Sequence, residues 1–110
     1  MVGVVSLSKY NEFDKTATLG YWLGEAFWRR GVMGEAAEEI LKFGFEELKL
    51  RRINVEAVVE NIPSNNLIKK LGFTFEGTRI KYAKAKATGI ANDVHMYGLL
   101  RERWLERNKN

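Results

Sequence analysis

The stretch that decides the fold of this chain is TLGYWLGEAFWRRGVMGEA, residues 18–36. Its first six residues have a strand pattern, and Arg29, Arg30, Gly31 and Gly34 then lead into an amphipathic helical pattern. A glycine-containing turn at a helix N-terminus offers unpaired backbone N–H groups and the positive end of the helix dipole, and the two guanidinium groups add charge. The stretch therefore predicts a cradle for an anion such as a pyrophosphate. A plain strand-to-helix turn with solvated arginines is the alternative interpretation, because such turns are common without a ligand.

Length and composition limit what the chain can be. Its 110 residues, 45% hydrophobic and 29% charged, are typical of one globular domain, expected over residues 1–110. Because it has no cysteine and one histidine, we expect no disulfide, no cysteine nucleophile and no metal site. No apolar run reaches the roughly 20 residues of a membrane span, and the first residues lack a secretory pattern, so a cytoplasmic protein is expected. The net charge of +4 fits a polyanionic partner, either nucleic acid or a phosphorylated cofactor.

Hydropathy patterning outlines a mixed chain of strands and helices. Alternation predicts strands at residues 2–7 and 16–23, joined by a polar turn over 9–15 as an antiparallel hairpin. Apolar residues spaced three and four apart predict an amphipathic helix over 35–48. Alternation with period two predicts the next strand at 53–60. A strand, a helix and another strand are thus expected in series.

The second half is predicted to contain shorter elements. Ser64 is a good N-cap for a helix over 65–71, and Gly72 suits the left-handed position after its end. Extended runs follow at 73–76, 79–86 and 93–100, the last two as a hairpin. His95 is expected to be solvated, and the residues after Trp104 are expected to be frayed.

Six motifs occur in an order that resembles the GNAT superfamily of N-acetyltransferases, and in particular its RimJ/RimL-like branch of ribosomal-protein N-terminal acetyltransferases. They are GYWL (20–23), FWRRGVMGEA (27–36), NIPS (61–64), KLGF (70–73), EGTR (76–79) and the ending Asp-x-x-x-Tyr-x-Leu-Leu (93–100). The resemblance covers residues 3–104. It implies an α/β (α+β) fold with a GNAT-like mixed, mostly antiparallel twisted sheet and flanking helices. It also implies an acetyl-CoA-dependent N-acetyltransferase that acts on a primary amine, such as a protein N-terminus.

The same resemblance implies which residues contact acetyl coenzyme A. In the family the loop before the long helix holds the cofactor's pyrophosphate, here through backbone amides between Arg30 and Glu35 and through the side chain of Arg29 or Arg30. The pantetheine arm pairs with a splayed strand, and a backbone N–H of Trp22 or Leu23 forms the oxyanion hole. The expected cofactor contacts are Tyr21, Trp22, Leu23, Arg29, Arg30, Gly31, Val32, Met33, Gly34, Glu35, Asn61, Ser64, Asn66 and Lys70. Ser64 has an equally plain interpretation as a helix cap.

Two positions depart from the family pattern. Many family members have a tyrosine in the short helix, four residues before its glycine, and this chain has Ile68 there. They often have a glutamate on the splayed strand, and the equivalent position, two residues before Gly20, is Thr18. Candidate replacements for the missing acid and base are Glu25, Glu35, Ser64 and Tyr97. The departures keep a second interpretation open, a CoA-binding remnant that no longer transfers acetyl groups.

The resemblance also raises the question of what covers the sheet. The family normally has a strand, two helices and a second strand before the segment that starts here near Val2, so we expect an N-terminally truncated form, the C-terminal two thirds of the usual fold. The strand at 2–7 would then be an exposed sheet edge, which predicts a homo-oligomer or a partner chain. A truncated reading frame is the plain explanation. A KH-like RNA-binding module is a third alternative, because 29–34 resembles a basic Gly-x-x-Gly loop, but a strand precedes this loop where KH domains have a helix.

Overall fold

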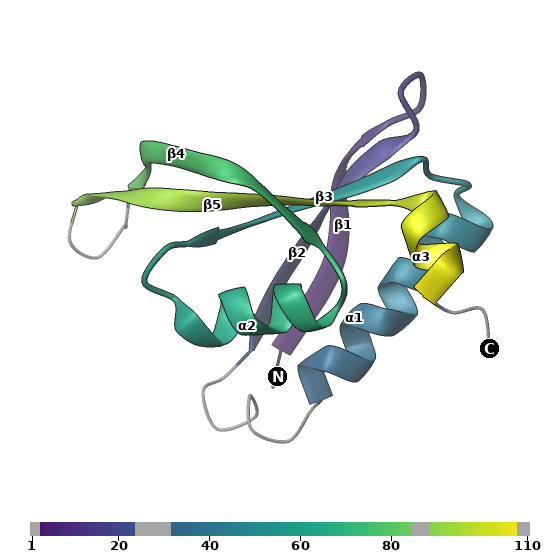
Figure 1. The fold of residues 1–110 in the computed structure, drawn as a ribbon, viewed down its shortest axis with the longest axis horizontal. Coiled ribbons are helices and arrows are strands. Elements are labelled where there is room, and N and C mark those ends of the chain that lie inside the picture. Colours follow the sequence, from purple (N-terminus) through teal and green to yellow (C-terminus); the bar gives the residue numbers. More distant parts are fainter. Residues whose placement is uncertain (1–2, 24–31, 85–88, 108–110) are drawn as a thin grey trace.

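The computed structural model describes residues 3–23, 32–84 and 89–107 as a mixed α/β fold (Figure 1). The strands are β1 (Gly3–Asn11), β2 (Thr16–Leu23), β3 (Arg52–Val58), β4 (Thr74–Lys84) and β5 (Ala91–Leu100). The helices are α1 (Val32–Lys42), the π-helical turn η2 (Phe43–Glu47), α2 (Ile62–Lys70) and α3 (Arg101–Arg107). The strands form one sheet in the order β1-β2-β3-β5-β4, in which only the β2–β3 pair is parallel. The expected mixed, mostly antiparallel sheet is confirmed.

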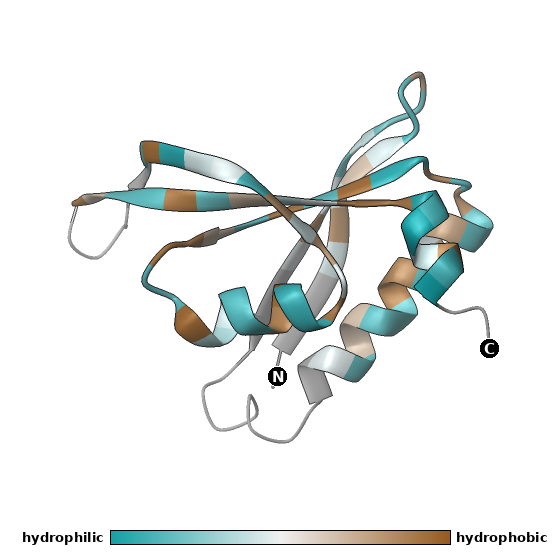
Figure 2. Cartoon of the chain, in the orientation of Figure 1, coloured by the Kyte–Doolittle hydropathy of each residue, from teal (hydrophilic) through white to brown (hydrophobic). Residues whose placement is uncertain are grey.

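The helices cover one face of the sheet. Ile53, Val55 and Ala57 alternate inward along β3, and each is at most 7% exposed. They belong to one apolar cluster with Leu41 of α1 and Ile68 of α2. Figure 2 shows the matching alternation of apolar and polar residues along the strands, and the helices lie together below the sheet in that view. The opposite face of β3 therefore presents polar side chains. No helix of the described part of the chain is long and apolar enough to cross a membrane.

Several expected boundaries are wrong. β1 continues to Asn11, so the hairpin turn is shorter than expected. The two runs expected at 73–76 and 79–86 are joined in one strand, β4, over residues 74–84, and residues 85–86 lie outside the described part. The strand continues through register shifts beside Gly77 and between Arg79 and Ala83. Residues 105–107 belong to α3 rather than to a frayed tail, because Trp104 is buried and stacks on Phe45 at a ring distance of 5.2 Å, while residues 108–110 lie outside the described residues.

The start of α2 also differs from the prediction. The N-cap is Asn61, whose side-chain oxygen accepts a hydrogen bond from the Ser64 backbone N–H at 3.2 Å. Ser64 lies inside the first turn and is 4% exposed, so it is not the cap. The prediction for Gly72 is confirmed, since its φ of +97° is the left-handed conformation that ends a helix.

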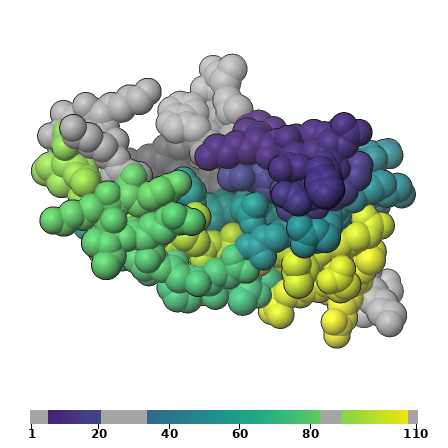
Figure 3. All heavy atoms as spheres, turned by 90° about the horizontal axis from the view of Figure 1, so that it is seen from above, coloured from purple at the N-terminus to yellow at the C-terminus, as the bar shows by residue number. Residues whose placement is uncertain are grey.

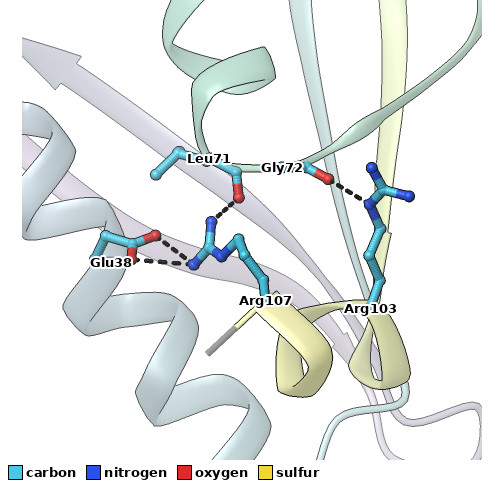
Figure 4. A network of polar contacts seen from close by, with 5 residues as sticks. All are labelled: Glu38, Leu71, Gly72, Arg103 and Arg107. Carbon is cyan, nitrogen blue, oxygen red and sulfur yellow. Dashed lines mark hydrogen bonds and ion pairs between the residues drawn. The ribbon is translucent and has the colours of Figure 1, made fainter. Parts of the chain in front are cut away.

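Two arginines of α3 contact the C-terminal end of α2, and one of them also contacts the middle of α1 (Figure 4). Arg107 donates to the Leu71 carbonyl and to the Glu38 carboxylate of α1, the latter at 2.7 and 3.0 Å. Arg103 Nε donates to the Gly72 carbonyl at 3.0 Å. The last carbonyls of a helix have no partner within the helix, so these contacts satisfy the C-terminal end of α2 and fix α2 against α1.

Candidate functional site

β2 and β3 separate after a short parallel ladder. They pair at Thr16 with Arg52, Ala17 with Ile53 and Thr18 with Asn54. Beyond these pairs β2 continues to Leu23 with β1 as its partner, and β3 continues to Val58 with β5 as its partner. Within the described residues no backbone pairing joins residues 19–23 to residues 55–58. These two edges define the β2–β3 opening, which is the splay that the resemblance implies.

Strand alternation indicates which backbone groups line this opening. The Lys15 carbonyl accepts from the Arg51 N–H at 2.7 Å, so it faces β3. In a strand the N–H and C=O of one residue point to the same side, and successive residues alternate. The Leu19 N–H belongs to the last rung of the parallel ladder, opposite the Asn54 carbonyl. The Leu19 carbonyl and both backbone groups of Tyr21 and Leu23 therefore face the opening, whereas those of Trp22 face β1. Of the two amides expected for an oxyanion hole, the one that fits is that of Leu23.

The N-terminus of α1 and the first turns of α2 lie together. A Cβ built on Gly34 would lie 3.7 Å from Leu67 Cδ1 of α2, an ordinary van der Waals distance. Glu35 lies in the first turn of α1, where a carboxylate is favoured by the helix dipole. The two sequence segments expected to bind the cofactor are thus adjacent. Arg29, Arg30, Gly31 and the candidate base Glu25 lie outside the described residues, as do the side chains of Tyr21, Trp22, Leu23, Val32 and Met33.

The expected contacts on α2 have different environments. Asn61 and Ser64 meet in the helix cap, as described above. Asn66 and Lys70 are exposed and one helical turn apart. Ile68, at the position of the expected tyrosine, is fully buried in the core. This position therefore packs the helix on the sheet and presents no acid.

A buried hydrogen-bond network at Asn65 was missed by the sequence analysis. Asn65 Nδ2 donates to the carbonyls of Val58 at 3.0 Å and Asn61 at 2.9 Å. Because carbonyls only accept, the amide orientation is fixed, and Asn65 Oδ1 must be the acceptor for its two other partners. These are the Tyr97 hydroxyl at 2.5 Å and His95 Nδ1 at 3.1 Å, so His95 carries a proton on Nδ1.

This network fixes the turn between β3 and α2 to β5. Tyr97 is 1% exposed, and its burial raises the pKa of the phenol above the ordinary value of 10.0. The hydroxyl therefore remains a donor at neutral pH. His95 also contacts the Phe75 ring edge-on at 5.1 Å, so the expectation of a freely solvated histidine is wrong.

A trough of about 620 Å³ crosses the face of the sheet opposite the helices. In Figure 3 the hollow lies between the β1–β2 side and β4, with β3 and β5 deeper. Its lining residues are Lys9, Thr18, Arg52, Asn54, Val55, Glu56, Glu76, Gly77, Thr78, Arg79, Tyr82, Met96 and Tyr97. Thr18 and Asn54 form the last pair of the β2–β3 ladder, so the trough reaches the β2–β3 opening. Its volume is that of a small-molecule site.

Within the trough, Arg52 and Glu76 form an ion pair with each other. Arg52 Nη1 donates to Glu76 Oε2 at 2.9 Å, a second guanidinium nitrogen binds the other carboxylate oxygen, and Arg52 Nε donates to Asn54 at 2.5 Å. The guanidinium lies over Gly98, where a Cβ would overlap it. Glu56 is exposed and lies opposite Met96 across the β3–β5 pair. Sequence alternation places Glu56 on the polar face, but only the sheet's curvature places it in a trough.

Comparisons with known proteins agree with this geometry. Residues 1–74 match the family described as the acetyltransferase (GNAT) domain. The chain is 34% identical over 104 residues to the uncharacterized N-acetyltransferase p20 of Bacillus licheniformis, covering 94% of this chain and 57% of that protein. It is 31% identical over 97 residues to the ribosomal-protein-serine acetyltransferase of Escherichia coli K12, covering 88% and 53%.

Solved structures show the same fold. A variant of the spermidine N-acetyltransferase SpeG from Vibrio cholerae matches with a TM-score of 0.88 at 24% identity, over 97% of this chain and 62% of that chain. The chain spans about half the length of the curated relatives it matches. Since the family match extends over most of the chain and the relatives exceed 30% identity, the chain belongs to the GNAT family of acetyltransferases.

Proposed function

We propose that this chain binds acetyl coenzyme A in the β2–β3 opening and transfers its acetyl group to a primary amine held in the trough. The observation that carries the proposal is the meeting of three features: an unpaired strand edge, the N-terminus of α1 beside α2, and a trough that reaches the same opening. An unpaired edge suits the amides of a pantetheine arm, and a helix N-terminus suits a pyrophosphate. The chemistry of these groups fits the cofactor.

The residues of the opening have distinct roles in this proposal. We propose that amides from Arg30 to Glu35 bind the phosphates, that Arg29 or Arg30 provides positive charge, and that Met33 would contribute apolar contact. Tyr21 and Leu23 direct backbone groups toward the pantetheine, and Asn61, Ser64, Asn66 and Lys70 flank it from α2. The Leu23 N–H donates to the carbonyl oxygen where negative charge develops during attack. Acetyl coenzyme A supplies the activated acetyl thioester.

Glu56 is the best-placed general base among the described residues. It lies on β3 two positions beyond Asn54, at the point where β2 and β3 separate, and it lines the trough. Thr18, where a glutamate was expected, lines the same trough and has no carboxylate. In the reaction the amine nitrogen bonds to the carbonyl carbon, the C–S bond breaks, Glu56 accepts the amine proton, and the thiolate takes a proton from water.

A calorimetric titration with acetyl-CoA and CoA tests the proposal. Gly34→Asp and Gly34→Ala form a matched pair, because a Cβ at this position has room and only Asp places a negative charge at the helix start. An aspartate in the first turn stabilises the helix, so weaker CoA binding by this variant would come from repulsion of the phosphates and not from loss of the helix. We expect Gly34→Ala to bind CoA and Gly34→Asp to bind at least tenfold more weakly. Equal binding by the two variants, or no binding by the unmodified chain, would contradict the proposal.

Turnover separates an enzyme from a CoA-binding remnant. We expect Glu56→Gln to lower kcat about a hundredfold with an unchanged Kd for acetyl-CoA, as for loss of a general base. Glu46→Gln, an exposed glutamate on η2, is the control. Binding without turnover across a panel of amines would favour the remnant. The KH-like interpretation is wrong, since β2, a strand, precedes α1 and the chain belongs to the GNAT family.

Self-association remains part of the proposal. Among the strands that the structure describes, β1 lies at one edge of the sheet and pairs with β2 alone, so its outer N–H and C=O groups suit pairing with another strand. A second copy of the chain is the partner we expect there. Size-exclusion chromatography with light scattering tests this, and a stable monomer at micromolar concentration would contradict it.

A further inference from the structure

We infer that the trough selects a primary amine that also carries a carboxylate, in preference to a diamine or polyamine. The inference rests on the proposed function, because it assigns the acceptor class of the same site. Four features of the trough carry it: its charge balance, the separation of its charges between floor and walls, the position of Arg79 over Tyr82, and the apolar surface between them.

The charge balance of the trough is positive once its internal ion pair is counted. Arg52 and Glu76 neutralise each other through two hydrogen bonds. The remaining charged lining residues are Lys9, Arg79 and Glu56. Among the described residues no carboxylate lies within ion-pair distance of Lys9 or Arg79. Two cations thus oppose one carboxylate, an arrangement that disfavours a doubly positive ligand.

The three charges lie in different parts of the trough. Glu56 is on the floor, at the end that reaches the β2–β3 opening, where the reacting nitrogen must lie. Lys9 is on β1 and Arg79 on β4, the two sides of the hollow seen in Figure 3. An ammonium group beside Glu56 therefore leaves the other end of the ligand near cationic walls. A carboxylate there is attracted, whereas a second ammonium is repelled.

Apolar surface lies between the charged groups. The Arg79 guanidinium lies over the Tyr82 ring, 5.0 Å from its centre, which orients a charge on an otherwise mobile side chain. Met96 is the cross-strand neighbour of both Glu56 and Gly77, so its side chain lies beside the proposed amine site. Methylene groups of a short ligand can pack on Met96 and Tyr82 while its two ends meet opposite charges.

The test compares two ligands of the same chain length, 5-aminopentanoate and 1,5-diaminopentane. Binding is measured by NMR titration of the Met96 methyl resonance in methionine-labelled protein, with or without CoA. Arg79→Glu and Lys9→Glu reverse one wall charge each, on opposite sides of the trough. Lys42→Glu reverses an exposed charge in the last turn of α1 and is the control. The same ligands then serve as acceptors in the turnover assay.

We expect the unmodified chain to prefer 5-aminopentanoate at least tenfold in both Kd and kcat/KM. Arg79→Glu and Lys9→Glu each reduce this ratio about tenfold, whereas Lys42→Glu leaves it unchanged. Equal affinity for both ligands, preference for the diamine, or a ratio that neither wall variant changes would overturn the inference. If the chain binds no CoA, the proposed function is refuted, but the inference is still tested, because the NMR titration without CoA measures the charge preference of the trough directly.

Discussion

Replacing Tyr97 by phenylalanine removes one hydroxyl group and almost no packing volume. The hydroxyl is one of two donors to Asn65 Oδ1, the other being His95 Nδ1 at 3.1 Å. After the replacement Asn65 Oδ1 still accepts from His95, so no buried acceptor is left without a partner. The loss is then that of one ordinary hydrogen bond, about 1 kcal/mol in the free energy of unfolding. For a domain of this size the melting temperature falls by roughly 4 °C.

The double variant Tyr97→Phe/His95→Phe tests the shared acceptor more sharply. His95→Phe keeps an aromatic ring beside Phe75 and also costs about 1 kcal/mol, since Tyr97 still donates. With both donors removed, Asn65 Oδ1 is buried without a partner, which adds about 1–2 kcal/mol beyond the sum of the single effects. Urea denaturation followed by circular dichroism measures all four free energies of unfolding. Effects that add within about 0.3 kcal/mol would refute the shared-acceptor network.

Three further predictions concern stability. Burial raises the pKa of Tyr97 above 10.0, so as the pH rises the phenol loses its proton in the unfolded chain before it does in the folded chain. The free energy of unfolding should therefore fall above pH 10, by up to about 1.4 kcal/mol per pH unit. Thermal melts of Tyr97→Phe should not show this part of the fall. Gly44→Ala should lower the free energy of unfolding by about 1 kcal/mol, because the new Cβ would lie 3.1 Å from three apolar methyl groups. A variant more stable than the unmodified chain would contradict this and show that the neighbouring side chains can move apart. Arg107→Met should lower the free energy of unfolding by about 1–2 kcal/mol, because it removes both the ion pair with Glu38 and the hydrogen bond to the Leu71 carbonyl. Glu38→Gln removes only the ion pair and should lower it by less. The reverse order in urea titrations would contradict this prediction.

Periodic elements could be predicted from the sequence because their signal is local. The alternation of Ile53, Val55 and Ala57 identified β3, and the three-and-four spacing identified α1. The cap of α2 was misplaced because Asn61 and Ser64 are both good cap residues, and the turn geometry decides between them. The sequence predicts two strands in place of β4 because glycine is common in turns, whereas Gly77 lies at a register shift within one strand.

The candidate site was only partly predictable, since its main contacts join distant residues. Asn65 meets His95 and Tyr97 from 30 and 32 residues away, and no local pattern reports such a contact. Glu56 has the alternation of any solvent-facing strand residue, and its place in the trough depends on the residues of β1 and β4 that rise on the two sides of the hollow. The order of a strand, β2, followed by a helix, α1, beside the opening was predictable because the strand and helix patterns are local, whereas the use of the glycines and arginines between them stays a prediction.

The separation of β2 and β3 has a consequence for amide hydrogen exchange. The amides of Tyr21 and Leu23 face the opening, whereas those of Gly20 and Trp22 face β1. Along one short strand, fast-exchanging and protected amides should therefore alternate residue by residue. A ligand that pairs with the free edge would slow every second amide and leave its neighbours as they were. Such a spacing distinguishes insertion of an extended molecule into the sheet from general tightening of the fold.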